Sequence, residues 1–458
     1  MSSAVVAANW LAPWNVGANL STRRPRCRAG VVPVECGGSR KVAERVMTRL
    51  QRTREDPLAV GGALRRLNNH SKMMQIQILE HLVDEDDWHL ALPMYKSLRE
   101  KAWYQWNPTL HAKMVAMLAT AQQSHEMQSM ILETPENLTV RDRLNLQVSL
   151  IETLGKRGLL DHALLIFQET KYLPLPSAGQ LGYRALVRAY VHAGLPHEAH
   201  LFLSEMKREG FKPCLDDYKA LLHAYGRDGF LADMEEVLQE ISEAGLKLDK
   251  TGYNMMLSAY GQARKFDMVV ETVERMRRLN ISCSVNSRNA ISKSCPTAIS
   301  LLSEMQDIPP NPASLCSELE LRKVPEGELM VIRELLILGV PPECVKYAEE
   351  TWELDLHRMF LGTANVTLFL WLQQLKARCI GGVKFPSEVR VVTGWGKHSD
   401  VEGKSVLKET VAEFLERMKS PFRVDSQNRG LLAARGSSLQ SWLAAMFQSS
   451  PEGCRSEA

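Results

Sequence analysis

One pattern recurs three times in this sequence: GYRALVRAYVHAG at residues 182–194, DYKALLHAYGRDG at residues 217–229 and GYNMMLSAYGQAR at residues 252–264. The copies are 35 residues apart, an interval kept by two sets of tyrosines, which are Tyr183, Tyr218 and Tyr253, and Tyr190, Tyr225 and Tyr260. Within each copy the apolar residues recur at intervals of three and four, which is the spacing of one helix face. Each copy therefore predicts a helix.

A second apolar-periodic segment follows each copy: PHEAHLFLSEMKREG, ADMEEVLQEISEAG and DMVVETVERMRRLN. Gly210 and Gly245 end the first two of these segments, where a helix C-terminus favours a left-handed residue. One 35-residue unit is thus a helical hairpin. A single hairpin cannot bury its apolar faces, so the units are expected to stack into an alpha solenoid.

Weaker copies of the unit extend the predicted array over residues 66–306. Gly158 lies 36 residues before Gly194 and begins the turn of one such copy. A partial unit from Val285 to Met305 closes the array.

The composition of the 458 residues narrows the class of protein. Hydrophobic residues make up 45%, and no apolar run approaches the roughly 18 residues that a membrane span needs. The nine cysteines include no CxxC pair, which argues against a zinc knuckle or a disulfide framework. The formal net charge is only +3, so any binding to nucleic acid must come from local patches.

The first 34 residues contain no acidic residue and carry four arginines among many small residues. This makeup is typical of an organelle transit peptide, which we assign to residues 1–45 and expect to be disordered. A disordered basic arm is the alternative interpretation.

Prolines at positions 309, 310 and 312 interrupt the helical pattern. Residues 307–351 are therefore predicted to be a linker that contains one helix, Glu326 to Leu338. From Trp352 the pattern changes to strand, helix, strand, helix, strand, strand, which predicts a small α/β domain over residues 352–447 with a parallel pair at its start. Its first helix, Ala364 to Arg378, is expected to be amphipathic. Residues 448–458 are expected to form a disordered tail.

Two polar motifs fall at the ends of the predicted parallel strands. Asp355 and His357 are two apart in the first strand, WELDLH, and are expected on one face. The next strand, SEVRVVTG, runs into a loop that contains Gly394, Trp395, Gly396, Lys397 and His398. Because binding crevices lie at the carboxyl ends of parallel strands, the two motifs should meet. The loop offers amides and a lysine to a phosphate, and a tryptophan to a base.

The repeats resemble pentatricopeptide repeats, whose marks are best matched by YNMMLSAYG at residues 253–261 and EMKREGFKP at residues 205–213. The resemblance implies that single-stranded RNA is held by the first helices. In that family, base choice rests on the residue after the first tyrosine and on the last residue of the unit. Here these pairs are Arg184 with Cys214, Lys219 with Asp249, and Asn254 with Ser284. Only the third pair has the readable type, one that favours a pyrimidine. Arg184 and Lys219 are either phosphate ligands or ordinary solvated helix residues.

The C-terminal region resembles the small MutS-related, or Smr, domain through LDLH at residues 354–357 and TGWGKHS at residues 393–399. Members of that family often have a glycine after the histidine, whereas Arg358 follows it here. The resemblance implies RNA cleavage, in which His357 or His398 moves a proton and Lys397 steadies the phosphate. Asp355 would orient water or hold Mg²⁺ or Mn²⁺, although one carboxylate is sparse for such an ion.

Repeats followed by an Smr domain resemble a group of land-plant organelle proteins. This resemblance favours the chloroplast, with the mitochondrion as alternative, and organelle RNA-processing or ribosomal partners. Three hypotheses stay open at this point. The protein processes a transcript enzymatically, or it binds RNA without catalysis in transcript stability or translation, or it is a protein-interaction scaffold.

Overall fold

The computed structural model describes residues 57–67, 70–132, 138–394 and 405–448, together with Thr48 and Leu50. The predicted transit peptide and the predicted tail beyond Gln448 lie outside the described residues. The chain divides into two compact units, Met1–Leu221 and Leu222–Ala458. None of the described helices is long and apolar enough to span a bilayer.

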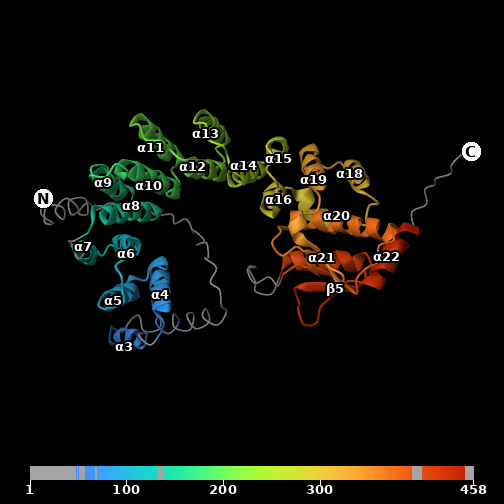
Figure 1. The fold of residues 1–458 in the computed structure, drawn as a ribbon, viewed down its shortest axis with the longest axis horizontal. Helices are drawn as coiled ribbons and strands as arrows, with labels where there is room; N and C mark the ends of the chain where they lie inside the picture. Colours follow the sequence, from blue (N-terminus) through green and yellow to red (C-terminus); the bar gives the residue numbers. More distant parts are fainter. Residues whose placement is uncertain are drawn as a thin grey trace, which may run out of the picture. The chain divides into compact units, whose positions relative to one another are not determined.

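The first unit consists of paired helices along its described length (Figure 1). They are α3 (Pro57–Leu67), α4 (Lys72–Asp84), α5 (Trp88–Arg99), α6 (Pro108–Thr120), α7 (Ser124–Leu132), α8 (Val140–Lys156), α9 (Leu160–Lys171), α10 (Ala178–His192), α11 (Pro196–Arg208) and the first half of α12 (Leu215–Asp228). Helix α10 packs on α8, α9 and α11, so apolar faces that one hairpin leaves open are covered by the next. The predicted solenoid of helical hairpins is confirmed here.

The second unit continues the pattern with α13 (Leu231–Glu243), α14 (Lys250–Gln262), α15 (Phe266–Arg278), α16 (Val285–Ser292) and α17 (Pro296–Glu304). The aligned tyrosines Tyr183, Tyr218 and Tyr253 are equivalent, because each is buried with at most 2% of its surface exposed. The identical spacing in sequence therefore corresponds to equal burial of the three side chains.

Glycines at the helix ends have the left-handed backbone that the sequence predicted. The φ angles are +85° at Gly210 and +68° at Gly245. In the following unit Asn280, 35 residues after Gly245, keeps a φ of +56°. The turn geometry is thus conserved along the repeats even where glycine is replaced by the residue that best tolerates this conformation.

The region predicted as a linker, residues 307–351, is packed against the array. It contains α18 (Pro312–Leu321), which the sequence analysis missed, and α19 (Glu326–Leu338). Pro312 is the first residue of α18 and Asn311 caps it by accepting a hydrogen bond from Ser314 N–H at 2.9 Å. A proline at the first helical position starts a helix, because the missing N–H has no partner there in any case.

A five-stranded sheet follows, with the order β1-β2-β3-β5-β4. The strands are β1 (Val345–Tyr347), β2 (Thr351–Asp355), β3 (Glu388–Val392), β4 (Arg423–Val424) and β5 (Leu431–Arg435), and a 3-10 turn at Pro342–Cys344 precedes them. β2 and β3 are parallel, as predicted, and all other pairs are antiparallel. The sheet differs from the prediction at both ends. Strand β1, which pairs with β2, lies before residue 352, where the predicted domain began. Helix α22 (Gly436–Gln448), which was not predicted, follows β5.

Helix α20 (Leu361–Ile380) is more buried than the predicted amphipathic segment 364–378. All residues from Gly362 to Leu372 are buried. The reason is its position, since α20 packs against α16, α17 and α19 and also against α21 (Val406–Arg417) and α22. A helix that is covered on several sides needs no polar face, so its sequence lacks a strong amphipathic pattern.

Candidate nucleic-acid interface

The second residue of each predicted base-choosing pair lies at the N-terminal end of a first helix, just before its first residue. Asp249 caps α14 by accepting a hydrogen bond from Gly252 N–H at 2.8 Å. Ser284 caps α16 in a capping box with Ser287. These side chains satisfy helix N–H groups that would otherwise have no partner. Capping therefore fixes the positions of the Asp249 and Ser284 side chains at the starts of α14 and α16.

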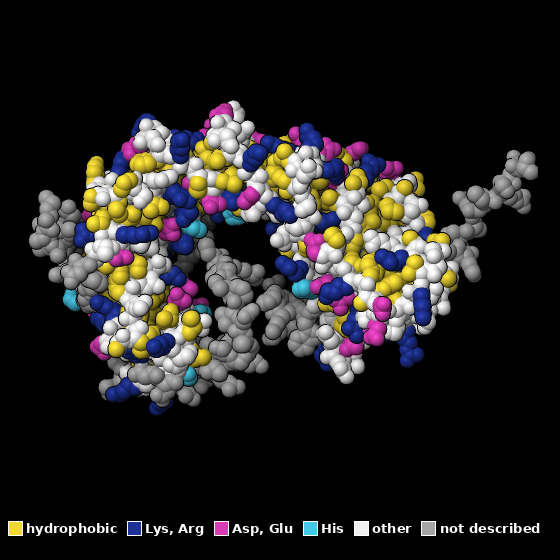
Figure 2. Space-filling model, viewed as in Figure 1, with side chains coloured by type: hydrophobic (Ala, Val, Ile, Leu, Met, Phe, Trp, Pro, Cys, Tyr) yellow, Lys and Arg dark blue, Asp and Glu magenta, His cyan; other side chains and the backbone are white. Residues whose placement is uncertain are grey.

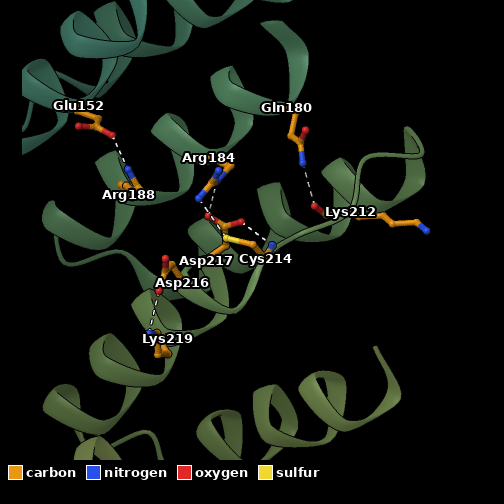
Figure 3. Close-up of polar contacts among 9 residues, drawn as sticks. All are labelled: Glu152, Gln180, Arg184, Arg188, Lys212, Cys214, Asp216, Asp217 and Lys219. Atoms are coloured by element: carbon orange, nitrogen blue, oxygen red, sulfur yellow. Dashed lines mark hydrogen bonds and ion pairs between the residues drawn. The ribbon is translucent and has the colours of Figure 1, made fainter. Parts of the chain in front are cut away.

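Arg184 is committed to a contact between neighbouring first helices (Figure 3). Its Nε donates to Asp217 Oδ1 at 2.9 Å, and a terminal nitrogen lies 3.1 Å from Cys214 Sγ. The other oxygen of Asp217 accepts from Cys214 N–H at 2.9 Å, and only 1% of the Asp217 side chain is exposed. The pair therefore joins α10 to the start of α12. Arg184 is held in an ion pair in this arrangement, with a quarter of its side chain exposed, and its role toward phosphate stays a prediction.

Further ion pairs and hydrogen bonds cross between adjacent helices on the same side (Figure 3). Arg188 of α10 lies 3.0 Å from Glu152 of α8, and Gln180 donates to the carbonyl of Lys212 at 3.1 Å. Glu152, Arg188 and Asp217 were not among the residues predicted from the sequence. Each residue is separated from its partner by about one repeat length, 33 or 36 residues. Oppositely charged residues at that spacing could have predicted the pairs.

Lys219 pairs with Asp216 at 2.8 Å, and 16% of its side chain is exposed. A hydrogen bond from Lys219 lowers the pKa of the Asp216 carboxyl. Burial, together with the nearby Arg227 guanidinium, lowers the pKa of His223, so this imidazole is neutral at neutral pH. Figure 2 shows the same balance, with basic and acidic side chains mixed over the repeats. The cations here are largely neutralised by neighbouring acids.

Asn254 differs from Arg184 and Lys219. Its Oδ1 is enclosed and has no hydrogen-bond partner within the described part of the chain. Burying an amide oxygen without a partner is unfavourable, and such atoms are uncommon in proteins. Among the three predicted pairs, Asn254–Ser284 thus contains a buried polar atom without a hydrogen bond inside the described residues.

A second polar corner lies where β2 and β3 end. Asp355 pairs with Val392 across the parallel strands, and Leu356 N–H donates to the Val392 carbonyl at 2.8 Å. The sequence had predicted His357 on the first strand. That strand, β2, ends at Asp355, so His357 lies in the turn that follows it. Asp355 Oδ1 accepts from His357 N–H at 3.0 Å and lies 2.5 Å from His357 Nδ1. The carboxylate therefore folds the turn and orients the imidazole.

Gly394 brings the end of β3 against this corner. A Cβ atom at Gly394 would lie 3.2 Å from His357 Cβ, and its φ angle is +80°. The described start of the second motif thus lies beside the first, while the rest of the predicted meeting stays a prediction. Trp395, Gly396, Lys397 and His398 lie outside the described residues. About half of the His357 side chain is exposed.

The described residues do not form a site for Mg²⁺ or Mn²⁺. Within residues 57–394 and 405–448, apart from the gaps in that range, no three His, Cys, Asp or Glu side chains converge as metal ligands. Asp355 is one carboxylate that is already bonded to His357. A hard divalent cation requires several oxygen ligands, and among the described residues of this corner Asp355 is the carboxylate.

A family model described as "Pentatricopeptide repeat domain" matches residues 180–228 and 236–296, and one described as "PPR repeat" matches residues 217–246. The chain is 28% identical over 435 residues to the pentatricopeptide repeat-containing protein At2g17033 of Arabidopsis thaliana, covering 91% of this chain and 84% of that one. A second Arabidopsis thaliana protein of this kind, At1g18900, is 36% identical over 92 residues, 20% of this chain and 11% of the relative.

A crystal structure of the pentatricopeptide repeat protein PPR10 in complex with an 18-nt psaJ RNA element matches 83% of this chain and 52% of its own, with 17% identity and a TM-score of 0.37. This chain thus spans about half the length of PPR10. The family models thus match the repeats between residues 180 and 296, and most of the chain is similar in sequence to a pentatricopeptide repeat-containing protein.

Proposed function

We propose that this protein binds single-stranded RNA through the first helices of its repeats and that its C-terminal α/β module, of the Smr type, acts on the bound RNA. The observation that carries the proposal is the Asn254–Ser284 pair. It occupies the base-choosing positions of a matched repeat, and Asn254 Oδ1, which is enclosed and has no partner within the described residues, would gain one if the side chain turned toward a base. An amide group offers both an acceptor and donors to a base edge. Among the relatives, PPR10 has been crystallised with RNA.

The other two pairs contribute little base discrimination in this proposal. Arg184 is held by Asp217, and Lys219 by Asp216. Asp249 is used as a helix cap. Because the nearby cations are paired with acids, we expect few counterions to be released on binding and hence a shallow salt dependence.

The test is a binding titration of the full chain with a labelled, randomised single-stranded RNA pool, followed by sequencing of the retained RNA. We expect retention, with a base preference concentrated at one position. Asn254→Ala should remove that preference. Asn311→Ala is a matched control, because it truncates an exposed asparagine that caps α18. Absence of retained RNA at low salt would favour the protein-scaffold interpretation.

We propose further that the Asp355–His357 corner is the reactive part of the module. Asp355 accepts a hydrogen bond from His357 Nδ1–H, which leaves Nε2 to take a proton from an attacking hydroxyl or water. The attacking oxygen forms a bond to phosphorus, the bond from phosphorus to the leaving ribose oxygen breaks, and that oxygen takes up a proton from water. Both residues of this proton transfer lie within the described part of the chain. Lys397 and His398 remain proposed phosphate and proton-transfer groups of the adjoining loop.

Cleavage of labelled RNA by the full chain, with and without a chelator, tests this step. His357→Ala should reduce the rate by about 10²-fold or more, since a general base contributes about that factor. Equal cleavage by wild type and His357→Ala would assign the module to RNA binding without catalysis, the second candidate function.

A plant organelle, with the chloroplast preferred, is the proposed location. Support comes from the arginine-containing, acid-free start of the sequence and from an Arabidopsis thaliana relative labelled chloroplastic, which is 31% identical over 99 residues. Fusion of residues 1–45 to a fluorescent protein should direct it to plastids in leaf cells. Cytosolic fluorescence would leave the segment as a basic arm.

A further inference from the structure

The last repeat, α16 with α17, differs from the three units before it. Counting 35 residues from Tyr253 leads to Arg288, so the marker tyrosine is lost. The next residue, Asn289, stands 35 residues after Asn254 and therefore occupies the base-choosing position of the last repeat. The partner position, 35 residues after Ser284, is Leu319, which is 2% exposed in α18. The last repeat thus keeps one polar base-choosing residue and has an apolar residue at the other position.

Asn289 does not face solvent, since only 6% of its surface is exposed. Its Nδ2 donates to the carbonyl of Arg358 at 3.0 Å, and its Oδ1 accepts from Phe360 N–H at 2.9 Å. Both ends of the amide are therefore used, and both partners belong to the turn that follows His357. Phe360 is the N-cap residue of α20, and its side chain makes no capping hydrogen bond. The Asn289 side chain instead accepts a hydrogen bond at this helix start.

Neighbouring contacts make this attachment rigid. Ser292 Oγ lies 2.8 Å from Thr363 Oγ1, and both residues are buried. A Cβ atom on Gly362 would lie 3.1 Å from Ser292 Cβ, so the helices approach as closely as glycine allows. Asn365 Nδ2 donates to the carbonyls of Ala298 and Ile299, at 3.0 and 2.8 Å.

The buried guanidinium of Arg288 fixes the other side of α16. It donates to the carbonyls of Cys283 and Leu338, at 2.6 and 2.7 Å. Arg288 is 5% exposed and stands where the other repeats have tyrosine. The last repeat thus has, in place of a buried tyrosine, an arginine that binds the end of α19.

We propose that the last repeat does not read a base, and that Asn289 is instead a positioning residue that holds the Asp355–His357 corner where the next nucleotide would lie. The corner then meets the nucleotide adjacent to the one that faces Asn254. The module would act at a fixed distance from the base that the array selects. This inference rests on the proposed binding of RNA by the repeats.

The first test uses base preference. Randomised single-stranded RNA is selected with the full-length wild type, with Asn254→Asp and with Asn289→Asp. We expect Asn254→Asp to change the preferred base at one position, and Asn289→Asp to change it at none. A changed preference at the neighbouring position in Asn289→Asp would overturn the inference, because Asn289 would then be a base reader.

The second test locates the corner on the RNA. Copies of the selected RNA, each with a single 4-thiouridine, are crosslinked to the protein, and the peptide containing residues 355–362 is identified by mass spectrometry. The crosslink should come from the nucleotide next to the one controlled by Asn254, and Asn289→Ala should spread it over several nucleotides. A purely structural role of Asn289 would leave the crosslinked position unchanged. A crosslink several nucleotides away in the wild type would overturn the proposal.

Hydrogen exchange separates this inference from the proposed function. In Asn289→Ala without RNA, the amides of residues 358–362 should exchange about tenfold faster, as expected when a hydrogen bond of this strength is lost. The rest of α16 and α20 should be unaffected, which checks that the variant is folded. Unchanged exchange at residues 358–362 refutes the positioning role even if RNA binds. If no RNA is retained by the wild type, the RNA-binding proposal fails and the exchange result still decides the role of Asn289.

Discussion

The contact between Arg184 and Asp217 makes opposite predictions for a structural and an RNA-binding role of the arginine. Replacing Arg184 with alanine leaves the Asp217 carboxylate enclosed, with 1% of its side chain exposed. Breaking a buried ion pair from one side typically costs about 3–5 kcal/mol. Asp217 keeps its bond from Cys214 N–H, and a quarter of the Arg184 side chain is exposed, so we expect a loss of about 2–3 kcal/mol.

Urea unfolding followed by circular dichroism measures this loss. With a slope of about 1–3 kcal/mol per M, the first unit should unfold at roughly 1 M lower urea in Arg184→Ala. Arg188→Ala is the matched control, because its partner Glu152 is 27% exposed and surface pairs are worth about 0–1 kcal/mol. The double variant Arg184→Met with Asp217→Leu should recover most of the stability, since an apolar pair of similar size leaves no buried charge.

RNA binding supplies the decisive comparison. If Arg184 only links repeats, its removal should leave the salt dependence of RNA affinity unchanged. A phosphate ligand would instead reduce the slope of log affinity against log salt by about 0.7 for a single strand. Normal stability of Arg184→Ala together with a reduced slope would refute the structural interpretation.

Three further predictions concern the backbone and the corner. Gly210→Ala should lower the stability of the first unit by about 1 kcal/mol, because the φ angle of Gly210 is +85°. Gly61→Ala should raise stability slightly, because Gly61 lies inside α3 with open space around it. Urea midpoints measure both changes. Gly362→Ala should lower the stability of the second unit, because the added methyl meets Ser292, and unchanged unfolding would contradict the close packing of α20 on α16. Burial, with the charges of Glu343 and Asp355, raises the pKa of Cys344 to about 11. Alkylation of Cys344, measured by mass spectrometry, should therefore be slow at pH 8 and increase up to about pH 11. Asp355→Asn should lower that pKa and speed alkylation at pH 8.

The repeat array was predictable from sequence because its packing is periodic. The same tyrosine fills the same site in each unit, so the 35-residue spacing carries the architecture without knowledge of any contact. The parallel pair β2 and β3 was also predictable, since an intervening helix forces the two strands to run in the same direction. Their carboxyl ends then bring Asp355, His357 and Gly394 together.

Elements whose surroundings are unique were harder to predict. Helix α18 begins at a proline within a cluster that has the composition of a linker, and only the cap at Asn311 distinguishes the two. Helix α20 lost its amphipathic pattern because helices cover it from several directions. The partners of Arg184 were also invisible, because a solvated and a paired arginine look alike in a sequence.

The loss of periodicity at the end of the array is itself informative. The tyrosine expected at position 288 is an arginine, and the glycine expected 35 residues after Gly261 is Pro296, the first residue of α17. A repeat that packs against another repeat retains the shared residues, whereas one that packs against a different fold is free to lose them. Arg288 and Asn289 both donate to backbone carbonyls outside the array. The first break in a sequence period therefore indicates where a solenoid ends and the surface for its neighbouring module begins.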